Sequence, residues 1–194
     1  MKRMKILMMV CMVLYACFIL PGCLDLDHFQ VHYDVSPELS GEMRMSFIGV
    51  HSDEETTAKQ KEEMAEFYQK VHQEMGKEQT LRWGIEDAKV LFANKTELRC
   101  DATLQGKVHN FVRSLAPLTE DYDFEIKKVD KIFSVKILTG KVTDKDLVYS
   151  ISIKYGGTIV SHNAHRFDEK QNLMTWTSVK LDKTGIQFVL NLKK

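Results

Sequence analysis

Apolar and polar residues alternate along most of the chain. The period is two over residues 29–35 and again over residues 43–47, and a turn-forming segment at 37–41 lies between them. Alternation with this period is typical of a half-buried strand, and two such strands joined through a turn form a β-hairpin. The sequence therefore predicts a hairpin near the start of the folded region.

The pattern then changes to helical spacing. Ser52 followed by Glu55 has the spacing of a helix capping box, and Gly76 is a typical residue at a helix end. Between them, apolar residues recur at steps of three and four: Met64, Phe67, Tyr68, Val71 and Met75. We expect an amphipathic helix here, and its charged face fits a solvated surface better than a binding surface.

Two shorter helices and a series of strands are predicted further along. The short helices cover residues 85–92 and 108–115, where apolar residues are three or four positions apart. Strands are expected at 96–104, 122–127, 132–138, 147–155, 158–161, 173–179 and 186–192. No repeat or linker divides residues 28–194. The expected fold is a single α+β domain of mostly antiparallel sheet, with one longer and one or two short helices packed on one face.

The first residues have the layout of an export signal. Basic residues cluster within residues 1–5, and residues 6–20 carry no charge. This run is shorter than the ~20 apolar residues of a typical membrane span, and Pro21 follows it. We therefore expect residues 1–22 to be a signal peptide.

The end of this segment, Leu20-Pro21-Gly22-Cys23, resembles the lipobox of bacterial lipoproteins. The resemblance implies cleavage between Gly22 and Cys23 and attachment of diacylglycerol to the Cys23 thiol. Residues 23–27 would then be a tether, and acyl chains would hold an extracytoplasmic domain at the cell membrane or the outer membrane. The alternative is an ordinary leader in which Cys23 has no role.

The other cysteines agree with this interpretation. Of the four cysteines, Cys11 and Cys17 lie in the expected leader, so only Cys100 remains in the folded part beside the lipidated Cys23. No intramolecular disulfide is then expected. Cys100 and Trp176 both lie on the apolar face of an expected strand, and we interpret both as core residues.

A further resemblance covers the mature part of the chain. A strand with a glycine turn at 151–157 is followed by an Asn163-Ala164 pair and then by Thr175-Trp176 in the next strand. After a lipobox, a leading hairpin and a helical insertion, this order resembles the LppM-like lipoproteins. The resemblance implies a lipid-anchored extracytoplasmic domain that contacts lipids or glycolipids, and it transfers no catalytic residue.

Charge narrows the list of partners. The chain has 27 Lys plus Arg and 27 Asp plus Glu, so its formal net charge is zero. Removal of the three basic residues of the leader leaves 24 minus 27, or −3, for residues 23–194. No global basic field attracts nucleic acid, so nucleic acid is not an expected partner. Net charge does not attract anionic lipid either, so the acyl chains must supply the membrane anchor.

The sequence offers little for catalysis. The close histidine pairs, His28 with His32 and His162 with His165, lack a third metal ligand at a recognisable spacing. Alternating carboxylates within residues 121–125 could resemble a glycosidase pair, but a solvated acidic strand edge is the simpler interpretation. No hydrolase or nucleotide-binding motif occurs. We therefore expect neither catalysis nor a bound metal or cofactor.

Three hypotheses for function follow. The first is a noncatalytic lipoprotein whose domain binds an envelope component, such as an envelope protein, or helps to assemble it. The second is a lipid or glycolipid carrier with a deep apolar pocket. That pocket would be lined by Met43, Met45, Phe47 and Phe67. The third and least favoured is a metal-dependent hydrolase.

Overall fold

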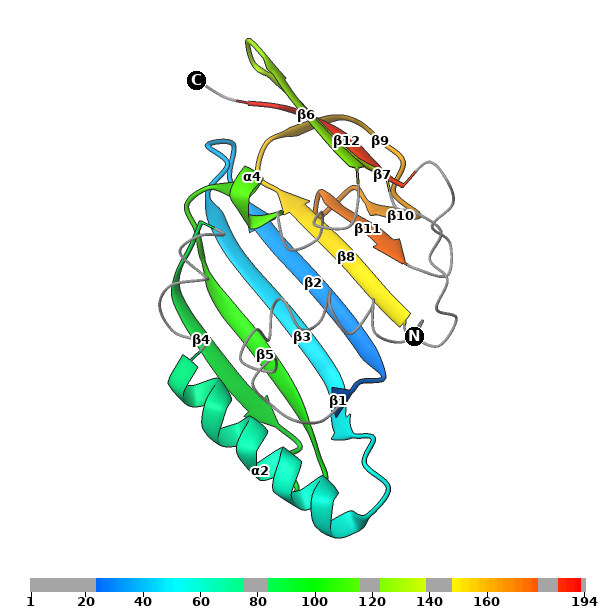
Figure 1. Ribbon diagram of the computed structural model, residues 1–194. Coiled ribbons are helices and arrows are strands. Elements are labelled where there is room, and N and C mark those ends of the chain that lie inside the picture. The colour runs from blue at the N-terminus through cyan, green and yellow to red at the C-terminus, as the bar shows by residue number, and fades with distance from the viewer. Residues whose placement is uncertain (1–23, 75–83, 116–122, 139–147, 178–184, 193–194) are drawn as a thin grey trace.

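A computed structural model describes residues 24–74, 84–115, 123–138, 148–177 and 185–192, and strands dominate these parts of the chain (Figure 1). The strands form two sheets. In spatial order, the larger sheet contains β10 (Arg166–Asp168), β11 (Leu173–Thr177), β8 (Val148–Tyr155), β2 (His28–Val35), β3 (Gly41–Ser52), β5 (Arg99–Val108) and β4 (Ile85–Ala93), with the short β1 (Leu24–Asp25) paired to β3. The smaller sheet contains β6 (Asp123–Val129), β7 (Ile132–Leu138), β12 (Ile186–Asn191) and β9 (Thr158–His162).

Strand pairing is antiparallel except at one position. The predicted hairpin is confirmed as β2 and β3, which pair from His28 opposite Ile48 to Val35 opposite Gly41. On its other side, however, β2 pairs with β8 in parallel. The prediction of mostly antiparallel sheet with few helices is confirmed, and the parallel pair makes the larger sheet mixed. Period-two alternation could not show this, because it is the same for both strand directions.

The core lies on one face of the larger sheet. The helix α2 (Thr57–Glu74) packs there through Phe67, whose ring centroid is 5.9 Å from that of Phe92 on β4. The short helix α4 (Phe111–Ser114) packs there too, because Phe111 contacts Tyr33 of β2 at 5.3 Å and Phe188 of β12 at 6.3 Å between centroids. The helices α2 and α4 and the smaller sheet together cover a single cluster of buried side chains.

The helix predicted over residues 85–92 is wrong, because this segment forms β4. Its register against β5 shifts between Glu86 and Lys89, and Asp87 has a left-handed φ of 51°. Such a bulge adds one residue to the strand. Ile85 therefore lies three positions before the next inward residue, Ala88, and a strand acquires the spacing of a helix.

The helix predicted from Ser52 exists but begins later. Ser52 is the last residue of β3, and the first hydrogen bond of α2 joins the Gln60 amide to the Thr56 carbonyl at 3.0 Å. The Thr56 hydroxyl accepts from the Lys59 amide at 3.4 Å, so Thr56 caps the helix. Gly76, the predicted end, lies outside the described residues.

The predicted helix at 108–115 is shorter than expected. Val108 still belongs to β5, and the helix begins only after Asn110, whose side chain accepts from the Arg113 amide at 3.1 Å. Besides β4, two of the described strands were not predicted. One is β10, and the other is β1, which occupies part of the expected tether 23–27: Leu24 pairs with Ser52 and is buried.

Candidate functional site

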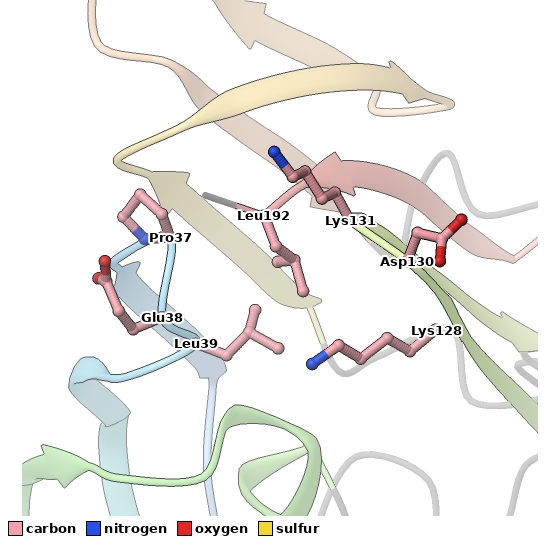
Figure 2. Close-up of a pocket in the computed structure, with 7 residues that line it drawn as sticks. All are labelled: Pro37, Glu38, Leu39, Lys128, Asp130, Lys131 and Leu192. Atoms are coloured by element: carbon pink, nitrogen blue, oxygen red, sulfur yellow. The ribbon is translucent and has the colours of Figure 1, made fainter. Parts of the chain in front are cut away.

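A cleft of about 540 Å³ lies where two hairpin turns meet (Figure 2). The loop between β2 and β3 forms one wall, the turn between β6 and β7 forms the other, and the residue that follows β12 closes the cleft between them. The lining residues are Pro37, Glu38, Leu39, Lys128, Asp130, Lys131 and Leu192. Both sheets therefore contribute to the cleft.

Local hydrogen bonds fix the β2–β3 loop. The Ser36 amide donates to the Ser40 carbonyl at 2.7 Å, and the Leu39 amide donates to the Ser36 carbonyl at 3.0 Å. Leu39 has a left-handed φ of 62°, and its carbonyl accepts from the Phe111 amide of α4 at 3.1 Å. The loop is thus tied to the core, which positions the Leu39 side chain in the cleft.

The opposite wall is a two-residue hairpin turn. Val129 pairs with Ile132, so Asp130 and Lys131 form the turn, and Asp130 adopts a left-handed φ of 52° that Asp tolerates well. The Leu192 amide donates to the Lys131 carbonyl at 2.6 Å. This bond holds Leu192 beside the turn.

The charges of the cleft are not evenly placed. Lys128 pairs with Phe133, a buried residue, and therefore lies on the inner face of the hairpin. Figure 2 shows its side chain reaching toward Leu39 and Leu192, while the carboxylates of Glu38 and Asp130 point away from that space. Among the described residues Lys128 forms no ion pair. The cleft therefore presents an ammonium group beside two leucines.

A second, smaller cleft lies against α2. Its volume is about 200 Å³, and it is lined by Glu54, Lys59, Glu62, Glu63 and Glu66. The Ser52 hydroxyl donates to Oε2 of Glu63, whereas Oε1 has no hydrogen-bond partner among the described residues. Burial raises the pKa of the Glu63 carboxyl, with smaller contributions from neighbouring carboxylates. Within the described ranges no three His, Cys, Asp or Glu side chains are arranged to hold a metal ion.

The residues singled out from the sequence lie in different places. Gly22 and Cys23 are outside the described residues. Cys100 and Trp176 are both fully buried. Burial raises the pKa of the Cys100 thiol, and the Trp176 indole donates to Asn163 Oδ1 at 2.9 Å.

Of the candidate histidines, His162 and His165 each accept a hydrogen bond from a backbone amide, and His32 lies near the carboxylate of Asp34. Nδ1 of His162 accepts from the Ala164 amide at 3.2 Å, and Nδ1 of His165 accepts from the Thr177 amide at 3.0 Å. In the segment 121–125, the side chains before Glu125 lie outside the described set, and Glu125 pairs with Lys127 at 2.6 Å. Nothing in this arrangement favours the hydrolase hypothesis.

The apolar residues proposed for a carrier pocket belong to the core. None of these four lines either of the two clefts described above. They are Met43, Met45, Phe47 and Phe67, and each is at most 2% exposed. In the part of the chain that the structure covers, these side chains fill space between the sheet and α2.

Sequence reasoning missed the cleft. The expected strands at 122–127 and 132–138 already implied a hairpin around Asp130, and the loop at 37–41 was also expected. The two turns meet because of the way in which the two sheets pack against each other. No local sequence pattern contains this information. Lys128 lies one residue beyond the strand predicted at 122–127, and its inward position follows only from its pairing with Phe133 in the structure.

Neither helix in the described ranges combines the length and apolar character needed to cross a membrane. No protein-family model and no curated protein matches the chain. Among solved structures, the folded domain of the Mycobacterium tuberculosis LppM protein is similar over 86% of this chain and 88% of that domain, with a TM-score of 0.48 and 8% identity. This is a weak structural resemblance.

Proposed function

We propose that the chain is a membrane-anchored, noncatalytic binding protein of the bacterial cell envelope. Acyl chains on Cys23 anchor it, and the cleft between the two hairpin turns binds an envelope component. The observation that supports this proposal is the cleft itself, in which both sheets present polar and apolar groups to solvent. The described residues that line the cleft include no histidine, cysteine or serine, and their charged and apolar side chains suit binding.

The position of the cleft suits a protein anchored at its N-terminus. Leu24, which follows the expected lipidation site, pairs with Ser52 at the end of β3, whereas the cleft adjoins the loop that precedes Gly41 at its beginning (Figure 1). The 12 residues of β3 separate these ends by about 35 Å. An anchor at Cys23 would thus leave the cleft accessible to components away from the anchoring bilayer.

A lipid or glycolipid carrier is the second candidate. It needs an enclosed apolar cavity that removes an acyl chain from water. The packing of Met43, Met45 and Phe47 in the core supports the first proposal over this one. The sequence resemblance to LppM-like lipoproteins, which rests on residues 151–157, 163–164 and 175–176, is the reason to keep the carrier as an alternative.

The anchor is tested by metabolic labelling with palmitate. Cys23→Ser offers no thiol for diacylglyceryl transfer, so we expect an unlabelled, uncleaved precursor. Cys100→Ser is the matched control and should be labelled normally. Label that still enters the Cys23→Ser protein would overturn the anchor.

The binding function is tested by hydrogen exchange on the full chain in detergent, with and without a detergent extract of the cell envelope. We expect slower exchange at residues 36–40 and 129–132, and unchanged exchange at the β4–β5 turn, residues 94–98, which precedes Arg99, the partner of His51 at the opposite end of β3. Unchanged exchange at both cleft walls would overturn the proposed function.

A further inference from the structure

We propose that the cleft captures the carboxyl end of a peptide chain whose last side chain is aliphatic, because it sets one ammonium group, that of Lys128, beside Leu39 and Leu192. This inference rests on the proposed binding function and names its ligand. It assigns the carboxylate to Lys128 and the terminal side chain to the two leucines.

The ammonium group supplies the charge selectivity. Lys128 has no ion-pair partner among the described residues, and the two carboxylates of the lining point away from it in Figure 2. An incoming carboxylate therefore meets a positive centre and can form a charge-assisted hydrogen bond. Lys131 adds a second positive charge at the rim.

The leucines supply the apolar surface. Leu192 is buried and belongs to the core cluster, and Leu39 is half-buried and packs against that cluster. The exposed part of Leu39 and the small exposed part of Leu192 form an apolar surface toward which the Lys128 side chain reaches (Figure 2). A volume of about 540 Å³ accommodates a terminal residue and its neighbour rather than a long ligand.

The hydrogen-bonding groups of the cleft favour a carboxylate over a phosphate. Phosphate sites usually combine several donors, often backbone amides. Here the Leu39 amide is bonded to the Ser36 carbonyl and the Leu192 amide to the Lys131 carbonyl. Of these groups, the lysine ammoniums remain as donors, which suits an anion with a single charge.

The openness of the cleft argues against a lipid tail. The core behind Leu39 is filled by side chains such as Phe111 and Tyr33, whose rings contact at 5.3 Å. An acyl chain at this site would remain largely in water and would gain little from burial. A single aliphatic side chain matches the apolar surface that the two leucines present.

The test uses the full chain in detergent and the peptide N-acetyl-Gly-Gly-Leu, with a free carboxyl end or as the C-terminal amide. We expect the free acid to bind about tenfold more tightly than the amide, as a charge-assisted hydrogen bond would give. Lys128→Met keeps the apolar stem and should abolish this difference. Lys170→Met removes a lysine of another exposed turn and should preserve it. Equal binding of acid and amide, or an unaltered preference in Lys128→Met, would overturn the proposal.

Two further probes separate the ligand class from the binding function. N-acetyl-Gly-Gly-Gly should bind less tightly than the leucine peptide, and equal binding would contradict the role of Leu39 and Leu192. Vesicles of phosphatidylglycerol should not compete with the peptide. Competition that depends on Lys128 would replace the peptide by an anionic lipid headgroup, leaving the binding function intact, whereas that function fails only if envelope extract leaves the cleft walls unprotected.

Discussion

The indole Nε1 of Trp176 donates a hydrogen bond to Oδ1 of Asn163, 2.9 Å away, and this contact joins the two sheets. Trp176 lies on β11 of the larger sheet, and the same Oδ1 accepts from the amide of Gln187 on β12 of the smaller sheet at 2.7 Å. The side-chain amide of Asn163 donates to the Gly185 carbonyl at 2.8 Å. One short polar side chain thus satisfies groups on both sides of the sheet junction.

Asn163→Ala should lower the free energy of unfolding by about 2–4 kcal/mol, because it removes the partner of a buried indole N–H and of two backbone groups. Urea denaturation measures the effect. Asn163→Asp keeps the acceptor for Trp176 and should be less damaging than alanine. An alanine variant as stable as the wild type would mean that these bonds contribute nothing to the junction.

Trp176→Ala tests whether the tryptophan is structural. The side chain is fully buried, so its loss should cost ~3–5 kcal/mol and lower the thermal midpoint clearly. A tryptophan that served as a platform for a sugar or a lipid headgroup would instead affect binding alone. An unchanged midpoint would therefore contradict the structural role.

Glu63 makes stability depend on pH. Its folded pKa is raised by burial, so between the ordinary pKa and the raised one the folded state holds a proton that the unfolded chain has lost. The stabilising contribution of the protonated Glu63 carboxyl is fully present below the pKa that this group has in the unfolded chain. The free energy of unfolding falls as pH rises through the pKa that it has in the folded state. Glu63→Gln cannot titrate, so it should gain stability relative to the wild type as pH rises.

Urea denaturation at a series of pH values checks this expectation. Glu62→Gln, on the exposed side of the same helix turn, is the control and should show a difference from the wild type that barely changes with pH. The groups that face Glu63 are Ser52 at the end of β3 and the carboxylates of Asp53, Glu54 and Glu66. A pH-independent difference for Glu63→Gln would show that its carboxyl is ionised equally in both states.

Alternation along the sequence was enough to predict most strands, because burial on one face imposes a period of two. It failed at β4, where the bulge after Glu86 changed the apparent period, and at β10, which has only 3 residues. The capping signal at Ser52 was ambiguous too, because a contact distant in sequence decides the role of this residue. Ser52 has the right neighbours for a cap, but its hydroxyl contacts Glu63 across the core rather than beginning the helix.

The candidate site was less predictable than the fold. Leu39 and Lys128 are 89 positions apart, and only the packing of the smaller sheet over the end of β2 brings their turns together. Trp176 could be assigned to the core from its strand face alone. Its polar partner Asn163 could not, because the contact depends on the geometry of the junction between sheets.

The segment before β2 contributes to stability. Leu24 is 8% exposed, and the Asp27 amide donates to the Ile48 carbonyl at 3.0 Å. A chain that begins at His28 should still unfold cooperatively, but with a free energy of unfolding about 2–3 kcal/mol below that of a chain that begins at Leu24. Calorimetry measures the free energy of unfolding of both chains. Equal stability would mean that residues 24–27 are a free tether after all.

Cys100 should be protected from thiol reagents in the folded protein. Its side chain is fully buried, and burial raises the pKa of the thiol, so little of the reactive thiolate forms and none of it meets solvent. In a chain that begins at Leu24, Cys100 is the one cysteine in the sequence, which makes alkylation by iodoacetamide easy to follow by mass. We expect slow alkylation in buffer and rapid alkylation in urea.

Cys100→Ala combined with Leu98→Cys moves the thiol to a position that is 38% exposed, and this variant should react rapidly in buffer. Comparable native rates at both positions would show that β5 opens readily, whereas slow reaction at Cys100 alone would show that the core shields its thiol.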